Sequence, residues 1–164
     1  MITNFLRRQH IVIYVIIFYS LITFIWSVYF LLKETLNIYD IEFFAPPSIN
    51  NDGVLKLIIG ALIVAPLLET LFFQKFIYYL FSKISYLKIR NILSCLVSGL
   101  LFGLSHTYSL YYMFSTTIIG FVLMYAYLIH IKNQKQSYWI VVTIHFLINL
   151  SALIENLISQ RLLI

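Results

Sequence analysis

The sequence contains uncharged, largely apolar stretches that are too long for the core of a small soluble domain. Residues 11–32 carry no charged side chain, and residues 91–131 contain no Lys, Arg, Asp or Glu. A helix needs about 20 apolar residues to cross the hydrocarbon core of a bilayer, so residues 11–32 can span it once. At about 1.5 Å per residue the second stretch would be about 60 Å long, roughly twice the thickness of that core. It must therefore turn.

Charged residues between these stretches divide the chain into about five predicted spans. We place the turn of the long stretch at SHTYS, residues 105–109. Since 62% of the residues are hydrophobic and only 10% charged, far from the balance of soluble proteins, we predict an all-α, polytopic membrane helix bundle. Residues 1–164 form one membrane domain, and its first span is too long for a signal peptide. The predicted spans are residues 11–32, 57–80, 91–106, 109–131 and 138–159.

The basic residues are unevenly divided between the two ends of these spans. Three of them, Lys33, Lys56 and Arg161, fall opposite the N-terminal side, and eight fall on it: Arg7, Arg8, Lys75, Lys83, Lys88, Arg90, Lys132 and Lys135. Because Lys and Arg are in excess in cytoplasmic loops, we expect a cytoplasmic N-terminus and an external C-terminus. The loop of residues 33–56, with Pro46, Pro47 and most of the acidic residues, then faces outward.

The partners that composition favours are lipids rather than nucleic acid. A net charge of +5 is consistent with this topology and with contact to anionic lipid, and no segment resembles a nucleic-acid-binding module. The Ile-, Phe- and Tyr-rich, Ala-poor composition favours a bacterial protein. We therefore expect an integral protein of the bacterial cytoplasmic membrane.

The second predicted span contains a single acid within PLLETLFFQ, residues 66–74. Between Lys56 and Lys75, Glu69 is the only ionisable residue. A carboxylate in lipid is costly unless it is paired, hydrated or protonated. If water reaches Glu69, it is a candidate general base; otherwise it is a protonated group that bridges helices. A proton site in a small transporter is a weaker alternative, because no inverted repeat is visible.

Two histidines and an amide lie in the later spans. FGLSH places Phe102 and His106 on one helix face, and HFLIN does the same for His145 and Asn149. Each His alone is explained as a helix-bridging residue. Together with Glu69, these groups on three spans are most stable when they face one another inside the bundle. Such a set can activate water and donate hydrogen bonds to an oxyanion.

ETLFFQ, FGLSH and HFLIN, in this order on separate spans, resemble the motifs of the CPBP family. These are the CAAX-protease and bacteriocin-processing membrane proteins, also called the ABI family, with motifs E-E-x-x-x-R, F-x-x-x-H and H-x-x-x-N or D. The resemblance covers a catalytic core of about residues 55–152. It implies an intramembrane endopeptidase that acts on a membrane-associated protein or peptide.

The resemblance also implies a role for each matching residue. Glu69 and His106 activate water, and His145 and Asn149 stabilise the oxyanion. The family is generally regarded as using a glutamate base, so we assign no metal and no other cofactor. A zinc ion held by Glu69 and the two histidines is the alternative chemistry.

The first motif departs from the family pattern at two positions, reading E-T-x-x-x-Q. Thr70 replaces the second Glu and Gln74 replaces the Arg. Replacing only one of these two charged residues would leave the other as an unpaired charge in the membrane, at a high cost in free energy. Replacing both with neutral residues avoids that cost. We expect Thr70 and Gln74 to form a neutral hydrogen bond in support of the site. Because the charge around Glu69 differs from the family pattern, a non-catalytic immunity or scaffold protein of the same fold is the rival function.

Overall fold

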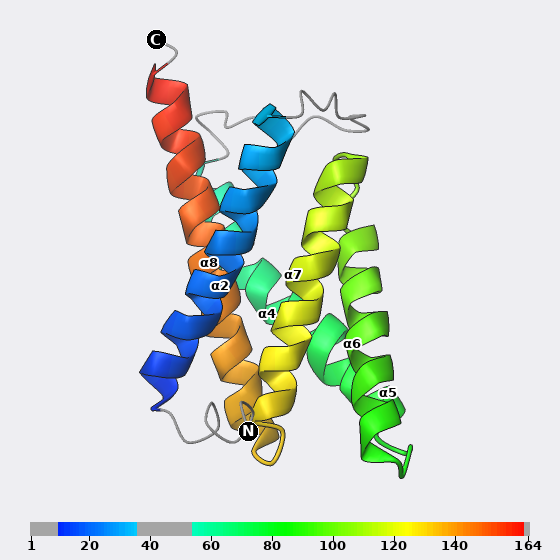
Figure 1. Cartoon of the computed structure of the whole chain (residues 1–164). Coiled ribbons are helices and arrows are strands. Elements are labelled where there is room, and N and C mark those ends of the chain that lie inside the picture. Colours follow the sequence, from blue (N-terminus) through cyan, green and yellow to red (C-terminus); the bar gives the residue numbers. More distant parts are fainter. Residues whose placement is uncertain (1–9, 36–53, 163–164) are drawn as a thin grey trace.

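The computed structural model describes residues 10–35 and 54–162, and the regular structure within these ranges is helical (Figure 1). In this described part, five helices are long and apolar enough to cross a membrane: Ile11–Tyr29, Gly60–Phe81, Leu87–Leu104, Leu110–Ile129 and Lys135–Glu155. The predicted all-α membrane bundle of about five spans is confirmed. Most of the predicted loop of residues 33–56, including Pro46 and Pro47, lies outside the described residues.

Four of the spans are α-helices without a break, and the second is composite. The four are α2 (Ile11–Thr35), α6 (Leu87–Leu104), α7 (Leu110–Ile129) and α8 (Gln134–Leu162). The second span consists of α3 (Val54–Ile59), η1 (Gly60–Val64), α4 (Ala65–Glu69), η2 (Thr70–Phe76) and α5 (Ile77–Phe81), where η1 and η2 are π-helical. No pattern in the sequence indicated the π-helical segments. Such segments often occur at functional sites, and Glu69 directly precedes η2.

The turn predicted at residues 105–109 is present between α6 and α7, although it contains neither Gly nor Pro. The last turn of α6 tightens, because the backbone N–H of His106 bonds to the carbonyl of Gly103 at 3.0 Å. Ser109 then begins α7 with an extended backbone, and its hydroxyl accepts a 3.1 Å hydrogen bond from the N–H of Tyr112. A serine is a favoured N-cap for this reason. The chain reverses direction in this turn, so His106 lies just after the end of α6.

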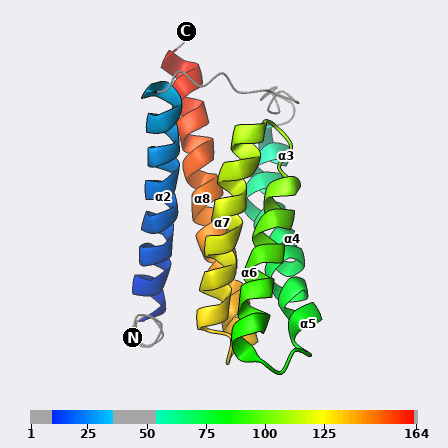
Figure 2. The same ribbon diagram turned by 45° about the vertical axis from the view of Figure 1, so that its right-hand side comes forward.

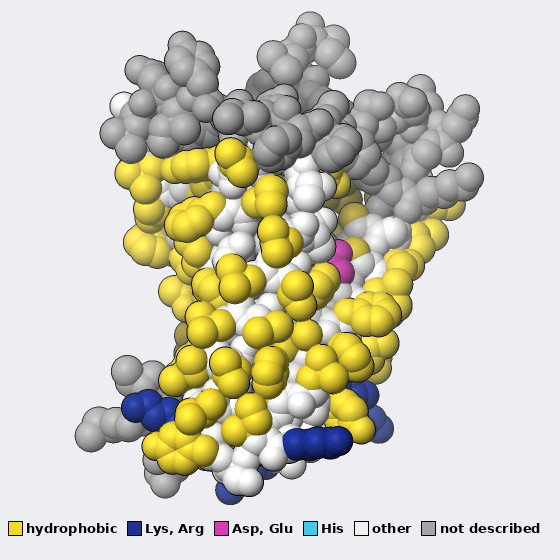
Figure 3. Space-filling model, turned by 90° about the vertical axis from the view of Figure 1, so that its right-hand side faces the viewer, with side chains coloured by type: hydrophobic (Ala, Val, Ile, Leu, Met, Phe, Trp, Pro, Cys, Tyr) yellow, Lys and Arg dark blue, Asp and Glu magenta, His cyan; other side chains and the backbone are white. Residues whose placement is uncertain are grey.

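Lys and Arg side chains in the described part of the chain gather near one end of the bundle (Figure 3). In Figures 1 and 2, the start of α2 and the connections α5–α6 and α7–α8 lie at one end, and the α6–α7 turn lies at the other. Figure 3 shows hydrophobic side chains over the middle of one face and Lys and Arg side chains near the first end. Arg7, Arg8 and the side chains of Lys33, Lys56 and Arg161 lie outside the described residues. The assignment of the first end to the cytoplasm stays a prediction.

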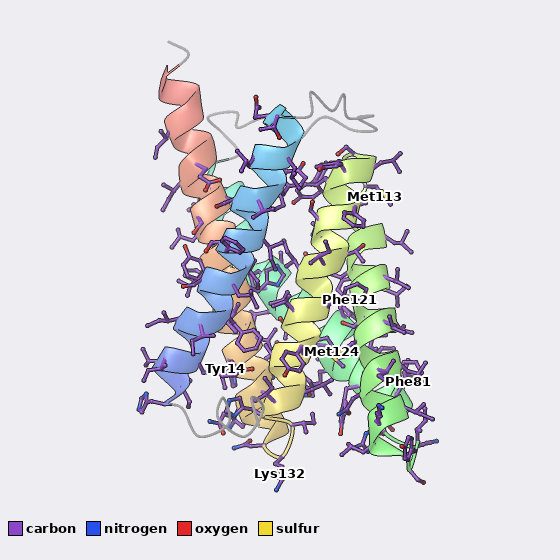
Figure 4. All side chains as sticks on the ribbon, in the orientation of Figure 1. Tyr14, Phe81, Met113, Phe121, Met124 and Lys132 are labelled. Carbon is purple, nitrogen blue, oxygen red and sulfur yellow. The ribbon has the colours of Figure 1, made fainter. Side chains whose placement is uncertain are left out.

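Glycine residues bring α6 and α7 close together, as small residues do in membrane bundles. A Cβ atom on Gly103 would meet the Thr117 side chain and lie 2.7 Å from the carbonyl oxygen of Met113. A Cβ on Gly99 would meet the ring of Phe121, which is labelled beside α7 in Figure 4. These contacts hold α6 against α7 up to the turn that carries His106.

Candidate active site

The structure brings Glu69 together with His106 and His145. The Glu69 Oε2 atom lies 3.8 Å from His106 Nε2 and 3.6 Å from His145 Nε2. The three groups come from α4, from the α6–α7 turn and from α8. Both separations exceed a hydrogen bond, but they are short enough for one water molecule to contact the acid and a histidine together. About a quarter of the Glu69 side chain (26%) is exposed, against 5% for His145.

His106 is oriented by the carbonyl group that the end of α6 leaves without its usual partner. The His106 N–H bonds to Gly103, so the Phe102 carbonyl is available to the side chains that follow it. It accepts from His106 Nδ1 at 2.7 Å and from the Ser105 hydroxyl at 2.7 Å. Since Nδ1 must carry the proton for this bond, the neutral ring presents the lone pair of Nε2 to Glu69.

The surroundings of His106 favour that neutral form. Burial lowers the pKa of its imidazole from the ordinary value, and the hydrogen bond to the Phe102 carbonyl counteracts this shift only in part. The Phe102 ring lies 4.5 Å from the His106 ring and 5.6 Å from the His145 ring, measured between centroids. The ring of Phe102 therefore packs against both imidazoles.

Asn149 connects α8 to the second span. Its Nδ2 donates a 2.7 Å hydrogen bond to the backbone carbonyl of Ala61 in η1. A side-chain amide has two N–H donors, so one is committed to this contact and one can bind a ligand. Asn149 also lines the same cavity as His106 and His145, which places these three residues around one space.

That cavity has a volume of about 130 Å³ and lies between α2, α6, α7 and α8. Three residues that line it were not assigned to the site from the sequence, namely Trp26 on α2, Tyr112 on α7 and Glu155 on α8. Their contribution depends on how helices pack, and no motif marks it. Helical spacing could have indicated Glu155 in part. It follows Ala152 by three positions and Ile148 by seven, so it shares a helix face with these two lining residues.

Thr70 and Gln74 are both fully buried, with no exposed side-chain surface. The expected hydrogen bond between them is wrong: the Thr70 hydroxyl and both polar atoms of the Gln74 amide have no partner among the described residues. Both side chains point into the bundle from the π-helical segment η2, but the short Thr70 side chain does not meet the Gln74 amide. They are therefore a buried neutral pair without a mutual bond.

One acid and two histidines close together could in principle be ligands of a zinc ion. Within the described ranges, no three His, Cys, Asp or Glu side chains are arranged to hold a metal ion. Whether the reaction uses a metal ion stays a prediction.

Comparison with known protein families gives one finding for this chain. A family model described as Rce1-like, type II CAAX prenyl endopeptidase Rce1-like, matches residues 51–151. The matched segment contains Glu69, His106, His145 and Asn149, and it begins after α2. Comparisons with curated proteins and with solved structures gave no match.

Proposed function

The chain belongs to the Rce1-like family of type II CAAX prenyl endopeptidases, and from this premise we propose that it uses Glu69 to activate water for peptide-bond cleavage. The family supports a CAAX-protease-like intramembrane endopeptidase in general, with a membrane-associated substrate. The observation that carries the finer proposal is the position of Glu69 Oε2, within 3.8 Å of one histidine nitrogen and 3.6 Å of another.

Glu69 and His106 offer two hydrogen-bond acceptors to one water molecule. Nδ1 of His106 holds its proton against the Phe102 carbonyl, so Nε2 accepts, as an ionised carboxylate does. A water molecule that donates one O–H to each keeps its lone pairs for the substrate carbonyl carbon. As the new C–O bond forms, Glu69 takes a proton from the water.

His145 and Asn149 are placed to act on the carbonyl oxygen of the substrate. The carbonyl π electrons move onto that oxygen when water attacks, and donors positioned there lower the barrier. Asn149 has one N–H left after its bond to Ala61, and His145 can donate from a ring nitrogen. When the tetrahedral intermediate collapses, the C–N bond breaks and the protonated Glu69 gives its proton to the leaving amine.

The direct test is cleavage of candidate membrane peptides by the full chain in liposomes. Because the substrate is unknown, the peptides come from comparing membrane proteomes of cells that express the wild type or Glu69→Ala, in search of a lost cleavage product. A product that requires Glu69 supports the proposal. The same product in cells with Glu69→Ala would favour the non-catalytic scaffold instead.

A chelator distinguishes metal-free catalysis by Glu69 from zinc-dependent catalysis, the alternative that the sequence left open. We expect chelators to leave cleavage unchanged, because the proposed steps use only side chains and water. Loss of activity with a chelator and its recovery on adding zinc would instead establish a zinc-dependent enzyme.

A further inference from the structure

One face of α8 donates hydrogen bonds to the second span at two backbone positions. Asn149 donates to the Ala61 carbonyl, and the Tyr138 hydroxyl donates to the Leu67 carbonyl at 3.0 Å. His145 lies between the two donors, seven residues after Tyr138 and four before Asn149. Because this spacing repeats every two helical turns, the three side chains share one face of α8. Asn149 and His145 belong to the proposed catalytic set, and Tyr138 has no role in it.

The first of the two backbone positions needs a donor because a proline follows it. In η1 the N–H of Ala65 bonds to the carbonyl of Gly60, five residues earlier. In the same pattern the Ala61 carbonyl would receive the N–H of Pro66, which proline lacks. A carbonyl inside a membrane needs a partner, and the Asn149 amide supplies it. The proline thus makes this part of the second span depend on α8.

The second backbone position lies in the turn that carries the proposed general base. The Leu67 carbonyl accepts the Tyr138 hydroxyl, and it also accepts the N–H of Thr70, the residue directly after Glu69. This turn belongs to α4, which has five residues and lies between the π-helical segments η1 and η2. Regular α-helix therefore ends close to Glu69 on both sides, and Tyr138 binds the backbone two residues before the acid.

Tyr138 is turned toward the bundle, unlike its neighbour in the chain. Trp139 is 52% exposed, as is usual for an aromatic residue near the end of a membrane span. Tyr138 is half-buried, and the centre of its ring lies 5.7 Å from the Lys75 Nζ atom of η2. Tyr138 therefore contacts the second span both before and after Glu69 in the chain.

We propose that Tyr138 is a positioning residue that fixes the Glu69 carboxylate relative to the His145 imidazole. The inference rests on the proposed function, because it assigns Tyr138 to the geometry of that site. Tyr138 does not line the cavity that His145 and Asn149 share, so it acts through the backbone of α4. Without its hydroxyl, the turn that carries Glu69 loses its hydrogen bond to α8, and the 3.6 Å separation between Glu69 Oε2 and His145 Nε2 is no longer fixed.

The first test compares two tyrosines whose hydroxyls make the same kind of bond. Tyr14 of α2 donates to the Ala126 carbonyl of α7 at 2.7 Å, and it does not line the cavity either. Tyr138→Phe and Tyr14→Phe each remove one hydrogen bond between helices of the full chain and keep the ring. In nanodiscs we expect Tyr14→Phe to lower the melting temperature at least as much, because Tyr14 is fully buried.

The two variants should differ in cleavage of the peptide that the proteome comparison identifies. We expect Tyr138→Phe to lower kcat about 10- to 100-fold, because a displacement of about 1 Å can cost about 10²-fold in rate. KM should stay unchanged, since Tyr138 does not line the cavity. Tyr14→Phe should leave kcat unchanged. A loss of kcat in Tyr14→Phe as large as that in Tyr138→Phe overturns the proposal.

A pair of tyrosine analogues separates the donor from the rest of the side chain. At position 138, 4-aminophenylalanine retains an N–H donor in place of the hydroxyl, and 4-fluorophenylalanine retains the size without a donor. We expect the amino analogue to keep most of the wild-type kcat and the fluoro analogue to match Tyr138→Phe. Equal kcat for the two analogues would show that the hydrogen bond to Leu67 does not position Glu69.

The position of the acid is also measured without turnover. In nanodiscs, protein with isotope-labelled histidine side chains gives an NMR signal for each of the four histidines, and His145→Gln identifies the signal of His145. Glu69→Gln shows how this signal responds to a change of the carboxylate. We expect Tyr138→Phe to shift or broaden the signal and Tyr14→Phe to leave it in place. An unchanged His145 signal in Tyr138→Phe overturns the positioning role.

The NMR measurement requires no substrate, so the two proposals fail separately. A chain that cleaves no peptide, but whose His145 signal shifts in Tyr138→Phe, would contradict the proposed function and support the action of Tyr138 on Glu69. A chain that cleaves its peptide equally well with Tyr138→Phe would contradict the positioning role alone.

Discussion

The Asn149 side chain donates a 2.7 Å hydrogen bond to the backbone carbonyl of Ala61. This bond joins the last span to the π-helical segment η1 of the second span, on the N-terminal side of Glu69 in the chain. Asn149 therefore has two tasks in the proposed site: it positions the two spans that carry Glu69 and His145, and it offers its second N–H to the substrate oxygen.

Asn149→Ala should for this reason lower both activity and stability. We expect kcat to fall about 10²- to 10³-fold, the range for one oxyanion donor, and the free energy of unfolding to fall by about 1 kcal/mol for the lost hydrogen bond. Peptide cleavage and thermal unfolding in the same nanodiscs measure the two effects. Unchanged kcat together with reduced stability would restrict Asn149 to the structural task.

Glu69→Gln should abolish turnover and preserve the fold. Gln keeps the shape of Glu and can form hydrogen bonds, but it cannot accept a proton at working pH. We expect a loss of at least about 10³-fold, within the range for general base catalysis, and nearly as large a loss for His106→Ala. Cleavage assays with a thermal-unfolding control measure both. Full activity of Glu69→Gln would rule out the assigned mechanism.

The buried neutral pair predicts an order of stability among charged variants. Gln74→Arg alone should destabilise the protein by about 3–5 kcal/mol, because position 74 is fully buried and the new charge has no partner. Gln74→Arg combined with Thr70→Glu should be less harmful. Thermal unfolding and the yield of monodisperse protein report the order. A double variant less stable than the single would show that the pair is not equivalent to the family's ion pair.

Two glycines give a matched test of helix packing. Gly103→Ala should destabilise the bundle by about 1–3 kcal/mol through overpacking, because its Cβ would meet Thr117 and the Met113 carbonyl. Gly60→Ala is the control, since a Cβ there has no atom within 4 Å. We also expect lower activity in Gly103→Ala, because α6 leads into His106. Equal melting temperatures for the two variants would contradict this account.

The orientation in the membrane is tested by single-cysteine labelling in a Cys95→Ser background. Lys83→Cys and Lys132→Cys, at the end where the basic residues lie, should react only when reagent reaches the cytoplasm. Tyr108→Cys, in the α6–α7 turn, should react with impermeant reagent in intact cells. The physical reason is the excess of Lys and Arg on one side of the sequence. The opposite labelling pattern would reverse the topology.

Much of the fold followed from the sequence, because the length and polarity of an apolar stretch are local properties. The charge-free residues 91–131 had to turn, and the turn lies at residues 105–109 as predicted. The composition could not indicate the π-helical segments around Glu69, because they depend on small differences in backbone hydrogen bonding.

The candidate site, too, was predictable from the sequence only in part. The sequence alone determined which groups cannot face lipid, so Glu69, His106, His145 and Asn149 could be named as a set before their distances were known. Only the tertiary structure decided what surrounds them. It joined Asn149 to Ala61, left Thr70 and Gln74 without a mutual bond, and brought Trp26 and Glu155 to the same cavity as the histidines. These relations depend on the rotation and tilt of whole helices, which the polarity of a single residue does not fix.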